Sequence, residues 1–167
     1  MQKLEPPESH HLLAAIGWLE LGSAAEANAE LANLEPSTQQ HPDVLEVRWA
    51  IYAEGQNWVE ALAAARSLLQ ADPKRSSGWL HQAYALRRVP GGGLQAAWDA
   101  LVPAYHQFPG EATIAYNLSC YACQLSQLEE ARKWFKRALK IGGKEQIKSM
   151  ALHDPDLEPL RQEILNS

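Results

Sequence analysis

The stretch "EEARKWFKRALKIGG", residues 129–143, has the composition of a short helix built for close packing. Ala131, Phe135 and Ala138 follow one another at spacings of four and three residues, which places them on one face of a helix. Gly143 stands where such a helix would end. Because small residues at the contact let two helix backbones approach each other, the stretch predicts a helix that packs tightly against a neighbouring helix.

The same pattern occurs three more times upstream, in "AEANAELANL" (25–34), "VEALAAARSLLQADP" (59–73) and "QAAWDALVPAYHQFP" (95–109). The four aligned alanines stand 34, 36 and 34 residues apart and are Ala27, Ala61, Ala97 and Ala131. A helix breaker follows twelve residues after each of the last three alanines; the breakers are Pro73, Pro109 and Gly143. A period near 34 residues is typical of repeat architectures, in which stacked units share one core.

These segments resemble the tetratricopeptide repeat, a unit of two antiparallel helices with small residues where the helices touch. The third repeat opens with Trp79-Leu80, places Ala83 at the small position of its first helix and carries two extra residues within "VPGGGLQ" (89–95). In the second repeat Trp49 falls where a small residue is expected. The register of the helix that carries Trp49 is therefore open by one residue.

The resemblance implies an all-α fold, a right-handed superhelical α-solenoid of about four helix pairs that forms a single domain over residues 1–167. The repeats would span 9–41, 42–75, 76–110 and 111–143, with helices over 9–21, 24–35, 42–54, 57–71, 76–88, 94–108, 111–125 and 127–141. The tail 144–167 would add helices near 144–152 and 156–165. Its segment "ALHDPDLEPLR" (151–161) resembles the closing segment of some bacterial tetratricopeptide proteins, and such a cap would cover the exposed core of the last repeat.

Composition and motifs exclude several other classes of protein. The net charge is −5 and no basic excess appears, which argues against a nucleic-acid binder. No apolar run approaches the roughly 20 residues that span a bilayer, and the N-terminus lacks the layout of a signal peptide. Gly91-Gly92-Gly93 lacks the Lys-Ser/Thr of a phosphate loop, and no nucleophile elbow occurs. We therefore expect a cytoplasmic, non-catalytic protein without a cofactor or a metal.

The two cysteines of the chain form a C-x-x-C spacing, Cys120-Tyr-Ala-Cys123, which occurs in redox dithiols and in zinc sites. Both fall inside the expected helix 111–125, away from the helix N-terminus that would lower a thiol pKa. A histidine such as His81 could add a third zinc ligand, but no fourth ligand is visible. Packing of small core residues is the preferred interpretation, and a thiol redox or metal sensor is an alternative function.

The first helix of each tetratricopeptide pair lines the inner groove of the array, and the resemblance carries these positions onto this sequence. The candidate peptide-binding residues are Leu80, His81, Tyr84, Arg87 and Arg88 in the third repeat and Tyr116, Asn117 and Cys120 in the fourth. Tyr and Arg are enriched at binding hot spots, and the arginine pair favours an acidic stretch in a protein or peptide partner. The expected function is a protein-interaction scaffold. The alternative is a homo-oligomerising module that pairs its aromatic faces through Trp49, Trp58, Trp79 and Trp98.

Overall fold

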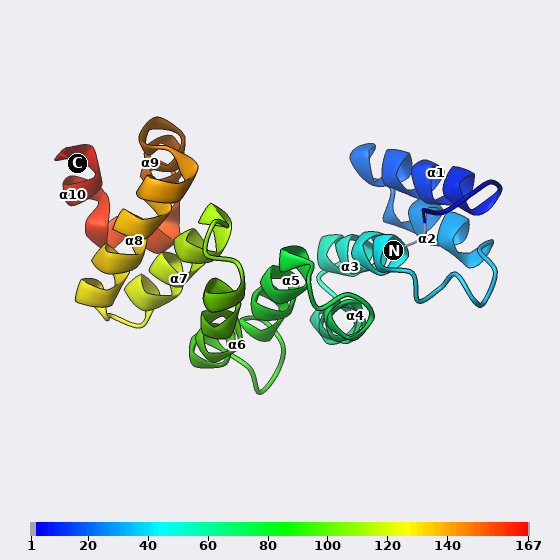
Figure 1. Ribbon diagram of the computed structural model, residues 1–167, viewed down its shortest axis with the longest axis horizontal. Helices are drawn as coiled ribbons and strands as arrows, with labels where there is room; N and C mark the ends of the chain where they lie inside the picture. Colours follow the sequence, from blue (N-terminus) through cyan, green and yellow to red (C-terminus); the bar gives the residue numbers. More distant parts are fainter. Residues whose placement is uncertain (1–2, 167) are drawn as a thin grey trace. The chain divides into compact units, whose positions relative to one another are not determined.

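A computed structural model of the protein describes residues 3–166, which form ten α-helices and one 3₁₀-helix and contain no strand. The chain divides into two compact units, Met1–Pro90 and Gly91–Ser167. The helices of the first unit are α1 (Glu8–Glu20), α2 (Ala24–Ala32), α3 (Pro42–Glu54), α4 (Trp58–Ala71) and α5 (Ser76–Leu86). Those of the second are α6 (Leu94–Gln107), α7 (Ala112–Gln124), α8 (Leu128–Gly142), α9 (Lys144–Leu152), the 3₁₀-helix η1 (Pro155–Leu160) and α10 (Arg161–Asn166), as Figure 1 shows.

The helix starts repeat with the period that the sequence predicts. The first helices of the pairs begin at Glu8, Pro42, Ser76 and Ala112, which are 34, 34 and 36 residues apart. The second helix begins 16 residues after the first in every pair except the third, where the interval is 18. The two extra residues therefore lie between α5 and α6, as expected, and the register of the second repeat is now fixed: Trp49 occupies the position of Ala83.

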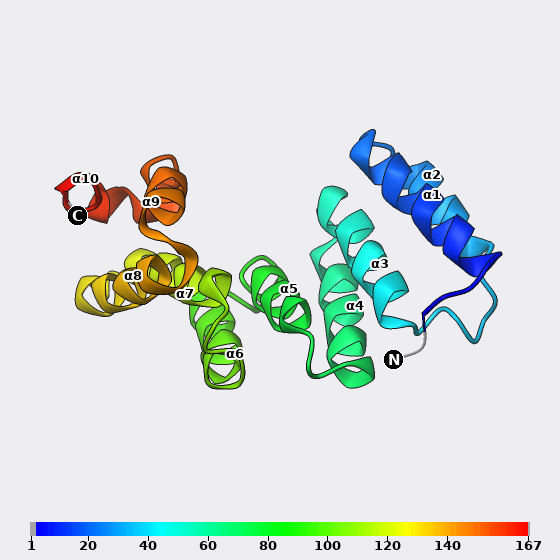
Figure 2. The same cartoon turned by 45° about the horizontal axis from the view of Figure 1, so that its top comes forward.

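In the first unit, α1 packs on α2 and α3 packs on α4, each pair joined by a short turn so that its helices run antiparallel, and α5 packs against α4 and α3 (Figure 2). The aligned alanines Ala27 and Ala61 are completely buried, which is the role that the repeat pattern predicts for them. Gly78 brings α5 close to α4, because a Cβ atom added there would lie 3.1 Å from Leu69 Cδ2. Small residues thus set the distance between neighbouring helices in this unit.

In the second unit, α7 packs against both α6 and α8, and the tail returns so that η1 lies on α7. Ala97 and Ala131 are completely buried, and the buried Ser119 hydroxyl donates a 2.9 Å hydrogen bond to the Ala131 carbonyl oxygen, which ties α7 to α8. The cap contributes three almost fully buried apolar side chains, those of Leu157, Leu160 and Ile164. The tail therefore covers the core of the last repeat, as expected for a capping segment.

Three predicted helix boundaries were wrong. The helix expected over 76–88 ends at Leu86, so that Arg87 and Arg88 lie in the turn that follows it. The helix expected over 24–35 ends at Ala32 and continues as turn. The last helix, expected over 156–165, is instead the 3₁₀-helix η1 followed by α10. Pro159 lies inside η1 and has no N–H to donate to a regular α-helical hydrogen bond, which accounts for the tighter geometry there. The described helices include none that is long and apolar enough to cross a membrane.

Candidate functional site

An aromatic cluster joins α3, α4 and α5 in the first unit. The rings of Trp49 and His81 are stacked, with 3.7 Å between centroids and 9° between planes. Tyr84 meets Trp49 edge-on, with 5.9 Å between centroids, and lies tilted to Trp58 at 5.8 Å. Of these rings Tyr84 is the one that reaches solvent most openly, with 38% of its surface exposed. We call Trp58, Tyr84 and Arg88 the Tyr84 surface, with Trp49 and His81 as its support.

Arg88 holds its guanidinium group over this surface. The guanidinium carbon lies 3.6 Å from the Tyr84 ring centroid and 5.1 Å from that of Trp58, and Nη1 donates a 3.0 Å hydrogen bond to the Tyr84 carbonyl oxygen. No carboxylate among residues 3–166 forms an ion pair with it. The aromatic rings orient the charge without neutralising it.

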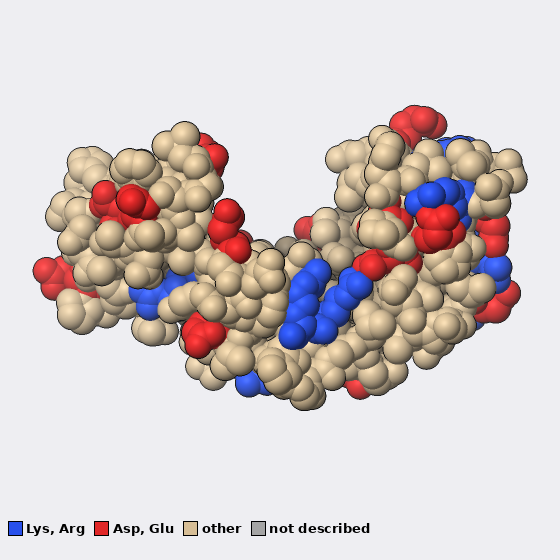
Figure 3. All heavy atoms as spheres, turned by 180° about the vertical axis from the view of Figure 1, so that it is seen from behind, with Lys and Arg blue, Asp and Glu red and all other residues tan. Residues whose placement is uncertain are grey.

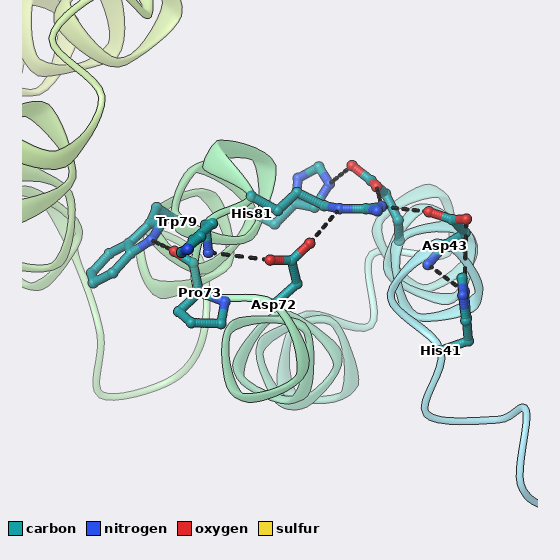
Figure 4. Close-up of polar contacts among 9 residues, drawn as sticks. His41, Asp43, Asp72, Pro73, Trp79 and His81 are labelled. Atoms are coloured by element: carbon teal, nitrogen blue, oxygen red, sulfur yellow. Dashed lines mark hydrogen bonds and ion pairs between the residues drawn. The ribbon is translucent and has the colours of Figure 1, made fainter. Parts of the chain in front are cut away.

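The support beneath the Tyr84 surface is fixed by a polar network between α3 and α5, drawn in Figure 4. Arg75 Nη1 lies 2.7 Å from Asp43 Oδ1 and 2.7 Å from Glu46 Oε2, while His81 Nε2 lies 3.7 Å from Glu46 Oε1. The neighbouring His81 ring, aided by Ser77 and Arg75 and opposed by burial, lowers the pKa of Glu46 to about 2. Glu46 is therefore ionised at neutral pH and holds His81 in place for stacking on Trp49.

The candidate residues of the third repeat lie around this cluster. Tyr84 and Arg88 form the surface itself, His81 is part of its support, and Leu80 is half-buried. Arg87 is the C-cap residue of α5 and is also half-buried.

Two of the three candidate residues of the fourth repeat, Tyr116 and Cys120, lie beneath the returning tail. The Tyr116 hydroxyl donates a 2.8 Å hydrogen bond to Asp154 Oδ2, and Cys120 Sγ lies 3.6 Å from the same oxygen. Their side chains retain only 6% and 2% of their exposure. Asn117 donates a 3.0 Å hydrogen bond to the Thr113 carbonyl within α7. Tyr116 and Cys120 are thus core residues under the cap of the second unit rather than an open wall.

Both cysteines are buried thiols that form no disulfide. Burial, reinforced by the negative charge of Asp156, raises the pKa of the Cys123 thiol above its usual value, so it stays protonated and weakly nucleophilic. Cys120 gathers with Asp154 and Asp156, their ligand atoms lying within 4.8 Å of one another. Asp154, however, already accepts the hydrogen bonds that hold the tail. This surrounding favours the packing role expected for the pair.

The repeat offset of 36 residues shows that the two units use the same helix positions differently. Tyr84 of α5 corresponds to Cys120 of α7, and Arg88 corresponds to Gln124. Gln124 Nε2 donates a 3.0 Å hydrogen bond to the Asp156 carbonyl. In α7, these positions therefore hold the chain's own segment around Asp154 and Asp156.

Sequence reasoning missed the ring stack of Trp49 on His81 and the central role of Arg75. The period gave a signal for the first, because Trp49 stands at a small-residue position of the repeat and therefore needs a neighbouring flat group to pack on. The role of Arg75 rests on contacts with α3 that the repeat pattern does not mark.

Comparison with known proteins identifies the fold. No protein-family model and no curated protein sequence matches the chain. A crystal structure of MamA matches it at a TM-score of 0.67 with 17% identity, covering 91% of this chain and 88% of MamA. TTC0263, a thermophilic tetratricopeptide repeat protein of Thermus thermophilus, matches at 0.70 with 16% identity, covering 96% and 100%. A MamA RS-1 ArsTM double mutant also matches at 0.70, with 15% identity over 98% and 93% of the two chains.

Proposed function

We propose that this chain, which has the all-α solenoid fold of tetratricopeptide repeat proteins, is a non-catalytic interaction module that binds an acidic segment of a partner protein at the Tyr84 surface. The observation that carries the proposal is the position of Arg88. Its guanidinium lies against Tyr84 and Trp58 and has no carboxylate partner among the described residues. An oriented, unneutralised arginine beside exposed aromatic surface is a typical binding hot spot.

The equivalent positions of α7 support the choice of an acidic partner. There, Cys120 and Gln124 contact Asp154 and the Asp156 backbone, which belong to the chain's own acidic segment Asp154-Pro155-Asp156. In the third repeat the same positions carry Tyr84, on α5, and Arg88, two residues after the end of α5, which offer more apolar area and a positive charge. An extended acidic segment from another protein would find a stronger counterpart at α5 than the tail finds at α7.

The proposed binding mode assigns a role to each part of the surface. A carboxylate of the partner pairs with Arg88 through charge-assisted hydrogen bonds. A neighbouring apolar side chain packs on the Tyr84 ring, while Trp49 and His81 keep that ring in place. Because the side chains of the Tyr84 surface are already held in place before binding, little side-chain entropy is lost when the partner docks.

The test is the recovery of partners from an extract of the source cells by the wild-type chain and by the double variant Tyr84→Ala/Arg88→Gln. We expect at least a tenfold loss of the recovered partner, the effect of about 1.4 kcal/mol of binding free energy. The matched control is Arg66→Gln, which removes an exposed arginine of α4 in the same unit and should leave the recovery of the partner unchanged. A partner that binds the double variant as tightly as the wild type would refute the Tyr84 surface as its site.

Self-association remains a second candidate because α1 and its C-cap residue expose several large apolar side chains. Leu13, Trp18 and Leu21 are 65%, 38% and 76% exposed. Light scattering of the purified chain separates the two functions. A stable dimer that Leu13→Ser/Leu21→Ser disrupts, and that Tyr84→Ala/Arg88→Gln leaves intact, would favour the oligomerising module.

The sensor alternative has less support, because the two thiols are 2% and 3% exposed. Thiol titration of the native protein checks it, and slow labelling relative to the unfolded chain is the expected outcome.

A further inference from the structure

Helix α8 concentrates the positive charge of the second unit. It carries five of that unit's eight basic residues, which are Arg132, Lys133, Lys136, Arg137 and Lys140. Arg132 pairs with Glu129 and Glu163, and Lys133 pairs with Glu130. Arg137 and Lys140, one helical turn apart, are exposed, and within residues 3–166 neither is paired with a carboxylate.

A cleft of about 420 Å³ opens beside these two cations. It is lined by Tyr105 of α6, Pro109, Arg137, Lys140 and Ile141. The lining therefore combines two positive charges with one tyrosine and two apolar side chains and includes no carboxylate.

Although the chain as a whole is acidic, Figure 3 shows that basic side chains gather in small groups on the face drawn there, so local positive surfaces exist on an acidic protein.

Aromatic rings hold Arg137 in place at the edge of this cleft. Its guanidinium carbon lies 4.3 Å from the Trp134 ring centroid and 5.4 Å from that of Tyr105. Tyr105 meets Trp134 edge-on at 4.8 Å, and Trp98 meets Trp134 edge-on at 6.1 Å. As at Arg88, stacking restricts the side chain, and no carboxylate among the described residues pairs with the guanidinium of Arg137. The second unit thus repeats, on different helices, the combination of an oriented arginine and aromatic rings.

We infer that this cleft is a second docking site for an acidic protein segment, distinct from the Tyr84 surface. A carboxylate of the segment would bridge Arg137 and Lys140, and an adjacent apolar side chain would pack on Tyr105 and Ile141. A nucleic-acid backbone is a poorer counterpart, because the second unit carries nine acidic residues against its eight basic ones and lacks the extended basic surface that binds phosphates in series.

The test is a titration of the ¹⁵N-labelled full chain, followed by backbone amide shifts. The probes are the capped peptides Glu-Glu-Leu-Glu-Glu and Gln-Gln-Leu-Gln-Gln, which differ only in charge. We expect the acidic peptide to shift amides around Tyr105–Pro109 and Arg137–Ile141, and the glutamine peptide to leave them unmoved. The variant Arg137→Gln/Lys140→Gln should weaken acidic-peptide binding at these amides at least about tenfold, because it removes both charges that would bind the carboxylate.

The matched control is Lys133→Gln/Lys144→Gln, which removes two exposed charges from α8 and α9. It should change the affinity much less than Arg137→Gln/Lys140→Gln does, since neither lysine lines the cleft and Lys133 already pairs with Glu130. Equal binding of the glutamine peptide would overturn the inference. So would the same amide shifts with inorganic phosphate at a lower concentration than the acidic peptide needs, which would make the cleft a phosphate site. Peptide shifts confined to the Tyr84 surface would support the proposed function and overturn this second site.

Discussion

Helices α5 and α7 occupy the same place in successive repeats and yet meet different surroundings. Tyr84 on α5 is 38% exposed and faces Arg88, whereas the corresponding Cys120 on α7 is 2% exposed and lies against Asp154. One unit leaves its first-helix position open, and the other fills it with a segment from its own tail. The comparison teaches that a repeat period identifies equivalent positions but does not determine what covers them.

The difference follows from what each unit must do with its apolar face. In the second unit the tail supplies Leu157, Leu160 and Ile164 to the core, and Asp154 must approach α7 so that these side chains can be buried. The hydrogen bonds that Asp154 accepts from the Tyr116 hydroxyl and from Asp156 N then hold the chain at that point. No comparable segment contacts Tyr84 within the described part of the first unit, and an oriented arginine stands there instead.

The largest expected effect on stability is that of Asp154→Ala, which removes a contact between the tail and α7. The change leaves the buried Tyr116 hydroxyl without its acceptor and removes the cap from Asp156 N. We expect a loss of about 2–3 kcal/mol in the free energy of unfolding, because an orphaned buried donor retains its full desolvation cost. Urea denaturation measures the loss, and faster labelling of Cys120 by a thiol reagent should accompany it.

The control for this variant is Glu158→Ala in the same segment. Glu158 forms an exposed ion pair with Arg161, and such pairs contribute about 0–1 kcal/mol. Equal destabilisation by the two variants would show that the tail is held by its overall charge rather than by the contacts of Asp154.

Much of the fold could be predicted from the sequence because the period is a strong signal. The four alanines fixed the order of the helix pairs, and Pro90–Gly93 marked the longer turn of the third pair. The prediction was weaker where proline acts locally, as at Pro159 in η1. The assignment of the chain to one domain rested on the same period, which runs through Pro90 and Gly91, and it stays a prediction beside the two compact units.

The candidate site was harder to predict than the fold. Repeat positions identified Tyr84, Arg88, Tyr116 and Cys120 as a set, but accessibility depends on long-range contacts that no local pattern contains. Asp154 lies 38 residues after Tyr116, and nothing in the repeat indicates that the tail returns to that helix. The Arg137 cleft was missed for a related reason, since the small residues of α8 carry the repeat signal and its unpaired charges do not.

A smaller loss of stability is expected from Glu46→Gln, which tests whether ionised Glu46 holds His81 and Trp49 in place beneath the Tyr84 surface. The folded state lowers the pKa of Glu46 to about 2 from 4.5, so ionised Glu46 stabilises the fold fully above pH 4.5. That contribution is lost as the pH falls toward about 2. Because Glu46 is partly exposed, we expect the variant to lose only about 1 kcal/mol at pH 7.

The difference between wild type and Glu46→Gln should therefore shrink between pH 4.5 and pH 2, which urea denaturation at several pH values measures. Glu60→Gln, an exposed glutamate on α4, serves as the control and should show no such dependence. A constant difference across this range would mean that the charge of Glu46 is irrelevant to holding His81.

The contact of Gln124 with the tail should matter less than that of Asp154. Gln124→Ala removes one hydrogen bond, to the Asp156 carbonyl, at an exposed position. We expect a loss of about 0.5–1 kcal/mol in urea denaturation, since water can replace the donor. The double variant Gln124→Ala/Asp154→Ala should lose less than the sum of the single losses, because both contacts hold the same segment. Strict additivity would indicate that the two contacts act on independent parts of the tail.

The smallest effect on stability is expected from Arg88→Gln. Arg88 is the residue of the first unit that corresponds to Gln124. Arg88 contributes a hydrogen bond within its own turn and a stacking contact that water partly screens, so its loss should lower the free energy of unfolding by only about 0.5 kcal/mol. Urea denaturation of Arg88→Gln beside Arg66→Gln measures this. A loss above about 1.5 kcal/mol would show that Arg88 is a structural residue. A small loss means that the fold does not depend on the charge at this position, which leaves the Arg88 guanidinium available to bind an acidic segment, as proposed.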